Sequence, residues 1–154
     1  MIIDAHTHIG FDYVFEEYHT AEDLARSMEL NKIDISIVQP GTTLDLDTAR
    51  DQHNAIADLA KIMPNRIFGM ATLYPRIPEA GYCDELERCV KKLGFVGTKL
   101  HPLAHAISPA HKASKKVFTN ALKLGIPVMI HTGDGIPWAL PSSARTANAS
   151  PAAS

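Results

Sequence analysis

The sequence is poor in cysteine, in tryptophan and in excess charge of either sign, and each shortage excludes a class of protein. Its 154 residues include 2 cysteines and 1 tryptophan, and the net charge is −2. Cys83 and Cys89 lie on one predicted helix with their side chains diverging, so we expect free thiols and a cytoplasmic location. The balanced charge predicts no binding to nucleic acid or to an anionic membrane surface.

Several sequence patterns are also missing. No apolar run approaches the roughly 20 residues that span a bilayer. The N-terminal residues lack the charged region and long apolar stretch of a secretion signal. There is no Gly-x-Ser-x-Gly motif and no pair of cysteines with zinc-finger spacing, which argues against a serine hydrolase and a structural zinc domain. With 45% hydrophobic residues, the chain has enough apolar material for one globular core.

Short apolar runs alternate with amphipathic runs along the chain, which is typical of a parallel sheet covered by helices. The predicted strands are Ile2–His6, Ile33–Val38, Arg66–Leu73, Phe95–Leu100 and Ile126–His131. One helix is expected to begin at Thr20, with Asp23 completing a capping box, and another to follow Pro109 and end at Gly125. The two helices between them are expected over Leu46–Met63 and Glu79–Leu93.

Two α/β architectures fit this alternation: an open doubly wound sheet, or part of an eight-stranded (β/α)₈ barrel of the TIM type. The first strand lacks the glycine-rich phosphate loop of a dinucleotide-binding fold. Polar residues follow the strands, as in barrel enzymes, at His6, His8, Gln39, Tyr74, Lys99, His101 and His131. We therefore predict a partial barrel of about five strands and four helices over residues 1–140, followed by a disordered Ala/Ser-rich tail over 141–154.

The strongest motif is Asp4-x-His6-x-His8, at the end of the first predicted strand. Side chains alternate with period two along a strand, so His6 and His8 face the same way and can share a metal ion. Asp4 is expected on the same face, one pleat deeper, where it would orient a histidine. The alternative is a pair of exposed histidines without a ligand role.

A third predicted metal ligand, His131, ends the apolar run that begins at Ile126. Asp134 in the following loop is more simply a solvated turn residue than a ligand. Lys99 and His101 share a strand face, and we expect them to bind an anionic group of a substrate. Alternatives are a carbamylated Lys99 that bridges two metals, or a lysine and a histidine that only pack at the strand end.

The segment from Gly10 to His19 is rich in aromatic residues and is expected either to wall a substrate pocket or to pack over the mouth of the barrel. Four histidines show no partner pattern and are expected to be surface or core residues: His19, His53, His105 and His111.

Together, Ile2–His8, Gly94–Pro102 and Ile126–Gly133 resemble motifs of the amidohydrolase superfamily. The closest branch is the amidohydrolase-related group that includes aminocarboxymuconate semialdehyde decarboxylase and resorcylate decarboxylases. The resemblance covers about residues 1–140. It implies a (β/α)₈ barrel with one divalent ion, zinc or manganese, bound by His6, His8 and His131. The group also uses a later histidine and a late aspartate without counterparts here, so a C-terminally shortened member is expected.

The resulting expectation is a metal-dependent hydrolase that acts on a small organic acid or amide through a metal-activated water. One alternative is a metal-dependent decarboxylase of the same superfamily. Another is an inactive fragment, or a metal- or partner-binding domain. Unpaired edges of a five-stranded sheet would promote homo-oligomers.

Overall fold

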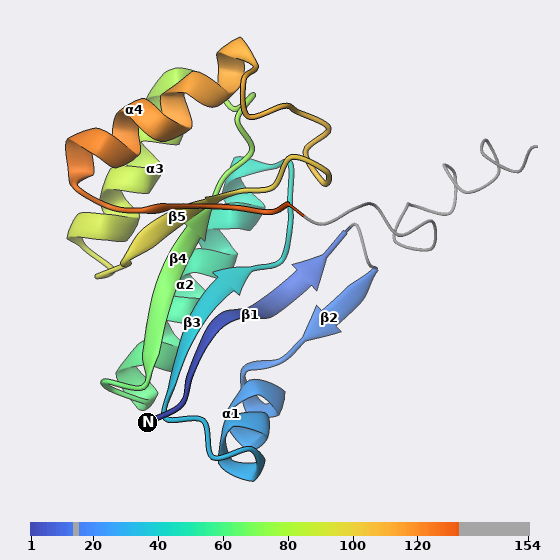
Figure 1. Cartoon of the computed structure of the whole chain (residues 1–154), viewed down its shortest axis with the longest axis vertical. Coiled ribbons are helices and arrows are strands. Elements are labelled where there is room, and N and C mark those ends of the chain that lie inside the picture. Colours follow the sequence, from blue (N-terminus) through green and yellow to red (C-terminus); the bar gives the residue numbers. More distant parts are fainter. Residues whose placement is uncertain (14–15, 133–154) are drawn as a thin grey trace, which may run out of the picture.

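A computed structural model describes residues 1–13 and 16–132 of the chain, and it shows one six-stranded sheet with helices packed on it (Figure 1). The strand order is β2-β1-β3-β4-β5-β6. All neighbouring strands are parallel except β2, which pairs antiparallel with β1. The strands are β1 (Ile3–Asp12), β2 (Glu17–His19), β3 (Ile35–Pro40), β4 (Ile67–Thr72), β5 (Gly97–Leu100) and β6 (Val128–Ile130).

Four α-helices connect the strands in the expected alternation. They are α1 (Ala21–Leu30), α2 (Leu46–Ile62), α3 (Glu79–Lys91) and α4 (Lys115–Leu124), and the short 3₁₀ helix η1 (Lys112–Ser114) precedes α4. The predicted α/β class, with five parallel strands and four helices, is therefore confirmed. The additional strand β2 was not predicted, because its three residues are all exposed and carry no apolar pattern.

The helix boundaries follow the capping residues of the sequence. Thr20 caps α1: its Oγ1 accepts from the main-chain N–H of Asp23 at 3.0 Å and donates to Asp23 Oδ2 at 2.7 Å. Gly125 ends α4 at a φ of 68°, in the left-handed region that favours glycine. The ends of these two helices therefore lie where the sequence predicts them.

The hydrophobic core lies between the sheet and the helices α2, α3 and α4, which cover one of its faces (Figure 1). Val38, Ile56, Leu86, Leu100 and Val117 meet there, each with 0% of its surface exposed. Burying an aliphatic side chain of this size contributes about 1.5–3 kcal/mol. This core fixes the strands, so the polar residues that follow the parallel strands gather at one edge of the sheet.

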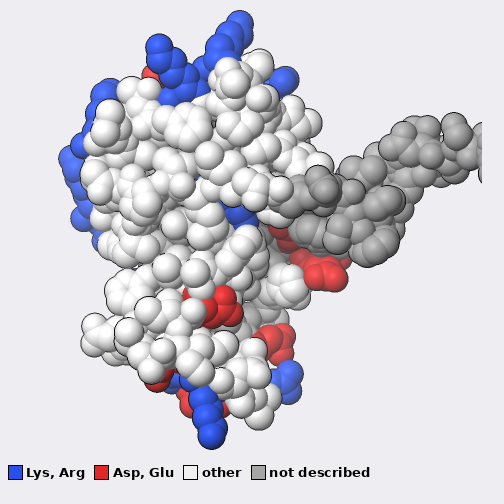
Figure 2. All heavy atoms as spheres, viewed as in Figure 1, with Lys and Arg blue, Asp and Glu red and all other residues white. Residues whose placement is uncertain are grey.

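Figure 2 shows Lys and Arg gathered over the helical layer formed by α3 and α4. Within the described part of the chain, no helix is long and apolar enough to cross a membrane. Cys83 and Cys89 are both free thiols, as predicted. The predicted tail at 141–154, together with Phe15 and Asp134, lies outside the described residues.

Candidate active site

His6 and His8 lie at a bulge in β1, and their rings converge. Asp4 pairs with Ser36 of β3, but the next paired residue, Thr7, faces Val38, so β1 carries one extra residue between these pairs. Bulges of this kind re-aim side chains at the ends of strands. The two Nε2 atoms come to 3.0 Å from each other.

The bulge also bears on the position of Asp4. Because the extra residue lies between Asp4 and Thr7, the alternation of side chains that relates His6 to His8 does not extend back to Asp4. Asp4 Oδ1 accepts from the main-chain N–H of His6 at 3.1 Å. The Asp4 carboxylate therefore holds the backbone at the bulge, and its orientation of an imidazole ring stays a prediction.

Lys99 reaches the same point from β5. Its Nζ lies 2.8 Å from His6 Nε2 and 3.3 Å from His8 Nε2, and only 2% of the residue is exposed. Two imidazole lone pairs that face each other at 3.0 Å repel unless a positive group lies between them. The Lys99 ammonium lies beside both nitrogens, where it can donate to either lone pair.

The protonation of His8 is fixed by its neighbour on β3. His8 Nδ1 lies 3.1 Å from the carbonyl oxygen of Pro40, which can only accept, so Nδ1 carries the proton and Nε2 keeps its lone pair. Burial, and then the charge of Lys99, lower the pKa of His8 to about 4. Burial followed by the charge of Lys99 also lowers the pKa of His6. Both rings are neutral at pH 7, the form that binds metals.

His101 and His131 form a second ring pair at the ends of β5 and β6. Their rings stack with centroids 4.0 Å apart and planes 15° from parallel. His101 Nδ1 accepts from the main-chain N–H of Ala104 at 3.2 Å, so Nε2 carries the ring proton. Burial lowers the pKa of His101 to about 3, followed by the charge of His131. His101 is therefore a neutral hydrogen-bond donor.

All five predicted site residues line one pocket of about 340 Å³, together with three residues of the segment that was expected either to wall a pocket or to pack over the mouth of the barrel. The predicted set is His6, His8, Lys99, His101 and His131, and the additional residues are Asp12, Glu17 and His19. Asp12 lies four residues after His8 in β1, a spacing that places both side chains on one face of a regular strand. A sequence prediction that extended this strand to Asp12 would therefore have included the residue in the site. Glu17 and His19 lie on β2, which the sequence pattern did not reveal.

The charges in this pocket are unequally solvated. Burial lowers the pKa of Lys99 to about 8, while the nearby carboxylate of Asp12 opposes that shift. Asp12 is buried, and its Oδ2 accepts from the main-chain N–H of Thr42 at 3.0 Å. A buried ammonium beside neutral imidazoles attracts an anionic group more strongly than an exposed one would, because water screens it less.

The donor set of this pocket offers a divalent cation two converging ligand atoms. His6 Nε2 and His8 Nε2 are neutral and converge, and the Pro40 carbonyl supports His8 in the way that metal-bound histidines are usually supported. His131 lines the same pocket, but the described residues contain just one set of three or more ligand atoms that all lie within 4.8 Å of one another, and it is a different one. His131 as third ligand therefore stays a prediction.

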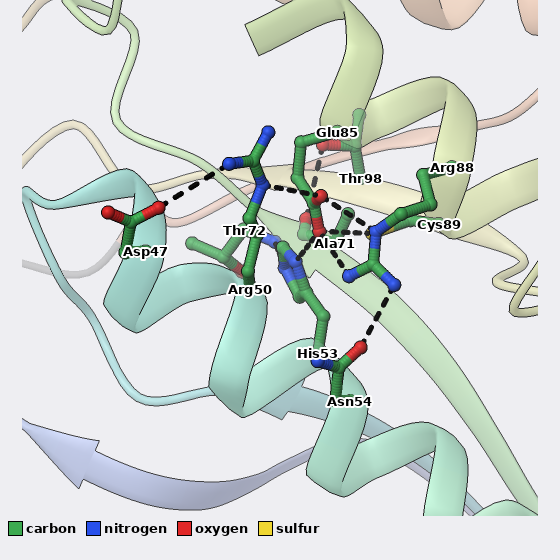
Figure 3. A network of polar contacts seen from close by, with 10 residues as sticks. All are labelled: Asp47, Arg50, His53, Asn54, Ala71, Thr72, Glu85, Arg88, Cys89 and Thr98. Atoms are coloured by element: carbon green, nitrogen blue, oxygen red, sulfur yellow. Dashed lines mark hydrogen bonds and ion pairs between the residues drawn. The ribbon is translucent and has the colours of Figure 1, made fainter. Parts of the chain in front are cut away.

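That other set is formed by His53, Glu85 and Cys89, in a buried network between α2, α3 and the end of β4 (Figure 3). Glu85 Oε1 lies 2.8 Å from His53 Nδ1, and Arg88 donates to both carboxylate oxygens at 2.8 Å. Arg50 Nε donates to Oε2 at 3.2 Å. His53 Nε2 accepts from the main-chain N–H of Thr72 at 3.2 Å.

These bonds leave no lone pair on His53 for a metal. Because Nε2 accepts from Thr72, Nδ1 carries the proton and donates to Glu85. Two arginines already neutralise Glu85; although burial raises the pKa of Glu85, the bonds from His53 and Arg88 outweigh it and keep the pKa well below its usual range. Burial raises the pKa of the Cys89 thiol. The cluster is therefore a closed structural network.

His53, expected to be a surface or core residue, is a fully buried core residue at the centre of this network. In the segment after His8, Tyr13 donates from its hydroxyl to the carbonyl oxygen of Ala104 at 2.5 Å, which ties β1 to the loop after β5. Phe11 and Tyr18 are exposed. This segment therefore contributes to the pocket mainly through Asp12, Glu17 and His19.

The family of this chain follows from its match to a family model. A family model described as amidohydrolase matches residues 3–153. The chain belongs to the amidohydrolase family. The match spans nearly the whole chain, and it confirms the relationship predicted from the histidine motifs.

Solved structures of related fold agree with this assignment. A 2,6-dihydroxybenzoate decarboxylase from Rhizobium matches with a TM-score of 0.70 at 16% identity, over 96% of this chain and 54% of that one. A 4-oxalomesaconate hydratase from Rhodopseudomonas palustris matches with a TM-score of 0.62 at 20% identity, over 86% of this chain and 52% of that one.

A 5-carboxyvanillate decarboxylase from Novosphingobium aromaticivorans, solved with bound manganese, matches at a TM-score of 0.66 and 18% identity, over 84% of this chain and 51% of that one. At these identities the likeness shows the fold. The chain of 154 residues spans about half the length of the structures that it matches.

Proposed function

We propose that this amidohydrolase-family chain carries a metal-dependent hydrolase site for a small organic acid or amide. The observation that carries the proposal is the convergence of two neutral imidazoles, His6 and His8, in a pocket that also holds Lys99 and His101. Family membership gives this arrangement its meaning, because a pair of histidines at a strand end is by itself a weak signal.

His6 and His8 would hold one divalent ion, with His131 as the proposed third ligand from the neighbouring end of β6. Bound zinc or manganese supplies Lewis-acid chemistry, polarising a carbonyl and lowering the pKa of water toward about 7. Manganese is present in one structure of similar fold, the 5-carboxyvanillate decarboxylase.

Lys99 and His101 are proposed to bind and orient the substrate. Lys99 lies on β5 and His101 directly follows the strand, and His101 Nε2–H is directed by the bond that its Nδ1 accepts from Ala104. An ammonium and an imidazole N–H together match the two oxygens of a carboxylate. Asp12 and Glu17 are the acidic groups that line the pocket, where they can hold or transfer a proton.

The second candidate is a decarboxylase. It is favoured by the structures of similar fold, of which two are named as decarboxylases of 2,6-dihydroxybenzoate and 5-carboxyvanillate. In that reaction the carboxylate held by Lys99 and His101 would itself leave as carbon dioxide, whereas in hydrolysis it would serve as the anchor.

Turnover by the purified protein distinguishes these reactions. The chain is freed of metal with a chelator, reloaded with zinc or manganese, and incubated with lactones and amides of small acids and with hydroxybenzoates. Release of acid without carbon dioxide supports hydrolysis, and release of carbon dioxide supports decarboxylation. We expect turnover to need the metal and a Lys99→Met variant to raise KM. Equal turnover with and without metal would contradict the proposal, as would no turnover by the loaded protein.

A further inference from the structure

The lone pairs of His6 and His8 are already engaged. His8 Nδ1 is committed to Pro40, so Nε2 is the ring's remaining acceptor, and Lys99 Nζ lies 3.3 Å from it. His6 Nε2 lies 2.8 Å from the same Nζ. Each pyridine-type nitrogen of an imidazole has one lone pair. A lone pair that accepts a hydrogen bond from Lys99 is not available to a metal at the same time.

Lys99 is held at this place by its strand. It pairs with Thr72 of β4 on one side and with Met129 of β6 on the other, and 2% of the residue is exposed. Its backbone is therefore fixed, and Nζ can leave the imidazoles only by rotation of the side chain within the pocket. Asp12 and Glu17 line the same pocket and offer carboxylates toward which a displaced ammonium can turn.

From this geometry we propose that Lys99 occupies the cation position of the metal-free protein, and that a divalent ion binds His6 and His8 only by displacing it. The proposal rests on the metal site put forward above as the proposed function. An ammonium left beside a divalent ion would repel it strongly in a buried pocket. Lys99 therefore competes with the metal and lowers the affinity of the site.

The test is the zinc affinity of the full chain, measured in competition with a chromophoric chelator. We compare the natural protein with Lys99→Met, which removes the ammonium and keeps an unbranched chain, and with Lys99→Arg, which retains the positive charge. The proposal predicts at least tenfold tighter zinc binding by Lys99→Met and no tightening by Lys99→Arg. Unchanged or weaker binding by a folded Lys99→Met protein overturns it, and weaker binding would identify Lys99 as a ligand.

A second measurement does not depend on a variant. The side-chain carbon and nitrogen resonances of Lys99 are followed while zinc is added to the natural protein. Displacement predicts that the Lys99 signals shift in proportion to the bound zinc and saturate together with it. Zinc binding that leaves these signals unchanged overturns the proposal even if Lys99→Met fails to fold.

The histidine variants separate this proposal from the one on which it rests. If zinc binds equally well to the natural protein and to His6→Ala and His8→Ala variants, the metal site itself is wrong. If zinc binding needs both histidines but is not tightened by Lys99→Met, only the role of Lys99 is wrong. Zinc binding by the natural protein that needs both histidines and is at least tenfold tighter in Lys99→Met would support both.

Discussion

Glu85 is a carboxylate with almost no contact with water, and its charge is balanced by three side chains. Its side chain has 0% exposure, and it meets Arg50, Arg88 and His53 within 3.2 Å. Burying a charge costs several kcal/mol unless partners compensate it. The same bonds that compensate Glu85 hold α2 and α3 against the end of β4 (Figure 3).

Glu85→Gln should destabilise the chain by about 3 kcal/mol, because it leaves buried donors facing a neutral amide. The matched control is Glu87→Gln on the same helix, which removes an exposed carboxylate that pairs with Lys91. We expect the control to leave the midpoint of urea unfolding nearly unchanged. A Glu85→Gln midpoint equal to that of the control would show that the network contributes nothing to stability.

Buried neutral histidines should make the metal-free chain sensitive to acid. Burial lowers the pKa of His105 to about 4 from an ordinary value of 6.5, and the residue is 2% exposed. Between these two values the unfolded chain binds a proton that the folded chain does not, so stability falls as the pH drops. His105 is a suitable probe because its ring is buried and it does not line the pocket of His6 and His8.

The contribution of His105 to the free energy of unfolding should therefore be nearly constant above pH 7 and decline below about 6.5. His105→Phe, which replaces the ring without a titrating group, should lose about 3 kcal/mol less than the natural chain between pH 7 and pH 4. Urea unfolding at a series of pH values measures this difference. Parallel pH profiles for the two proteins would contradict it.

Among single residues, the sequence predicted those whose position follows from the strand pattern. These residues lie on a strand or directly after one, and all of them line the pocket: His6, His8, Lys99, His101 and His131. The His53–Glu85 pair could not be predicted, because the two residues lie on different helices and their meeting depends on how α2 packs against α3. Local spacing contains no information about that packing.

At the scale of elements, the end of β1 determines the shape of the pocket, and it depends on a close approach by the loop after β3. A Cβ at Gly41 would lie 2.2 Å from the carbonyl oxygen of Phe11 and 2.7 Å from the main-chain N of Asp12. Both neighbours are backbone atoms, which cannot yield without moving the strand. Gly41 is therefore required for the position of Asp12 and of the hairpin beyond it.

Gly41→Ala should cost about 1–3 kcal/mol through this overlap and should displace Asp12 in the pocket. Gly81→Ala is the control, because its new methyl would meet only side-chain atoms, the flexible end of Leu46 at 2.9 Å and Ile77 Cγ2 at 3.8 Å, within a helix that favours alanine. Thermal unfolding of both variants measures the difference. Equal melting temperatures would show that β1 and the β3 loop adapt freely.

The boundaries of the elements could be predicted where capping chemistry marks them, and were missed where it does not. Thr20 and Gly125 end helices as expected. β2 and the extension of β1 to Asp12 form a hairpin whose strands lack an apolar pattern, so the sequence shows only an aromatic-rich loop. The fold of the hairpin depends on pairing across a turn rather than on local composition.

On the scale of the whole molecule, the sheet has a parallel strand at one edge. Within the described residues, β6 pairs with β5 alone, whereas β1 is covered at the opposite edge by the short strand β2. Unpaired parallel edges promote association between chains. We propose that the chain forms homo-oligomers through β6, where Ile130 is 37% exposed.

Sedimentation velocity over a range of concentrations tests this proposal. The average sedimentation coefficient should rise with concentration for the natural chain and rise less for Ile130→Lys, because charges on an edge strand oppose pairing. Leu122→Lys, on the exposed surface of α4, is the control and should behave like the natural chain. A monomer at every concentration would contradict the proposal.

The central claim is that His6 and His8 bind one divalent ion at the edge of this sheet. The most direct measurement is the zinc content per chain after loading and dialysis, determined by mass spectrometry for the natural protein and for its histidine variants. The account predicts one ion per natural chain, little zinc in His6→Ala and His8→Ala, a reduced content in His131→Ala, and no change in His111→Ala, outside the pocket. Equal zinc in all five proteins would contradict it.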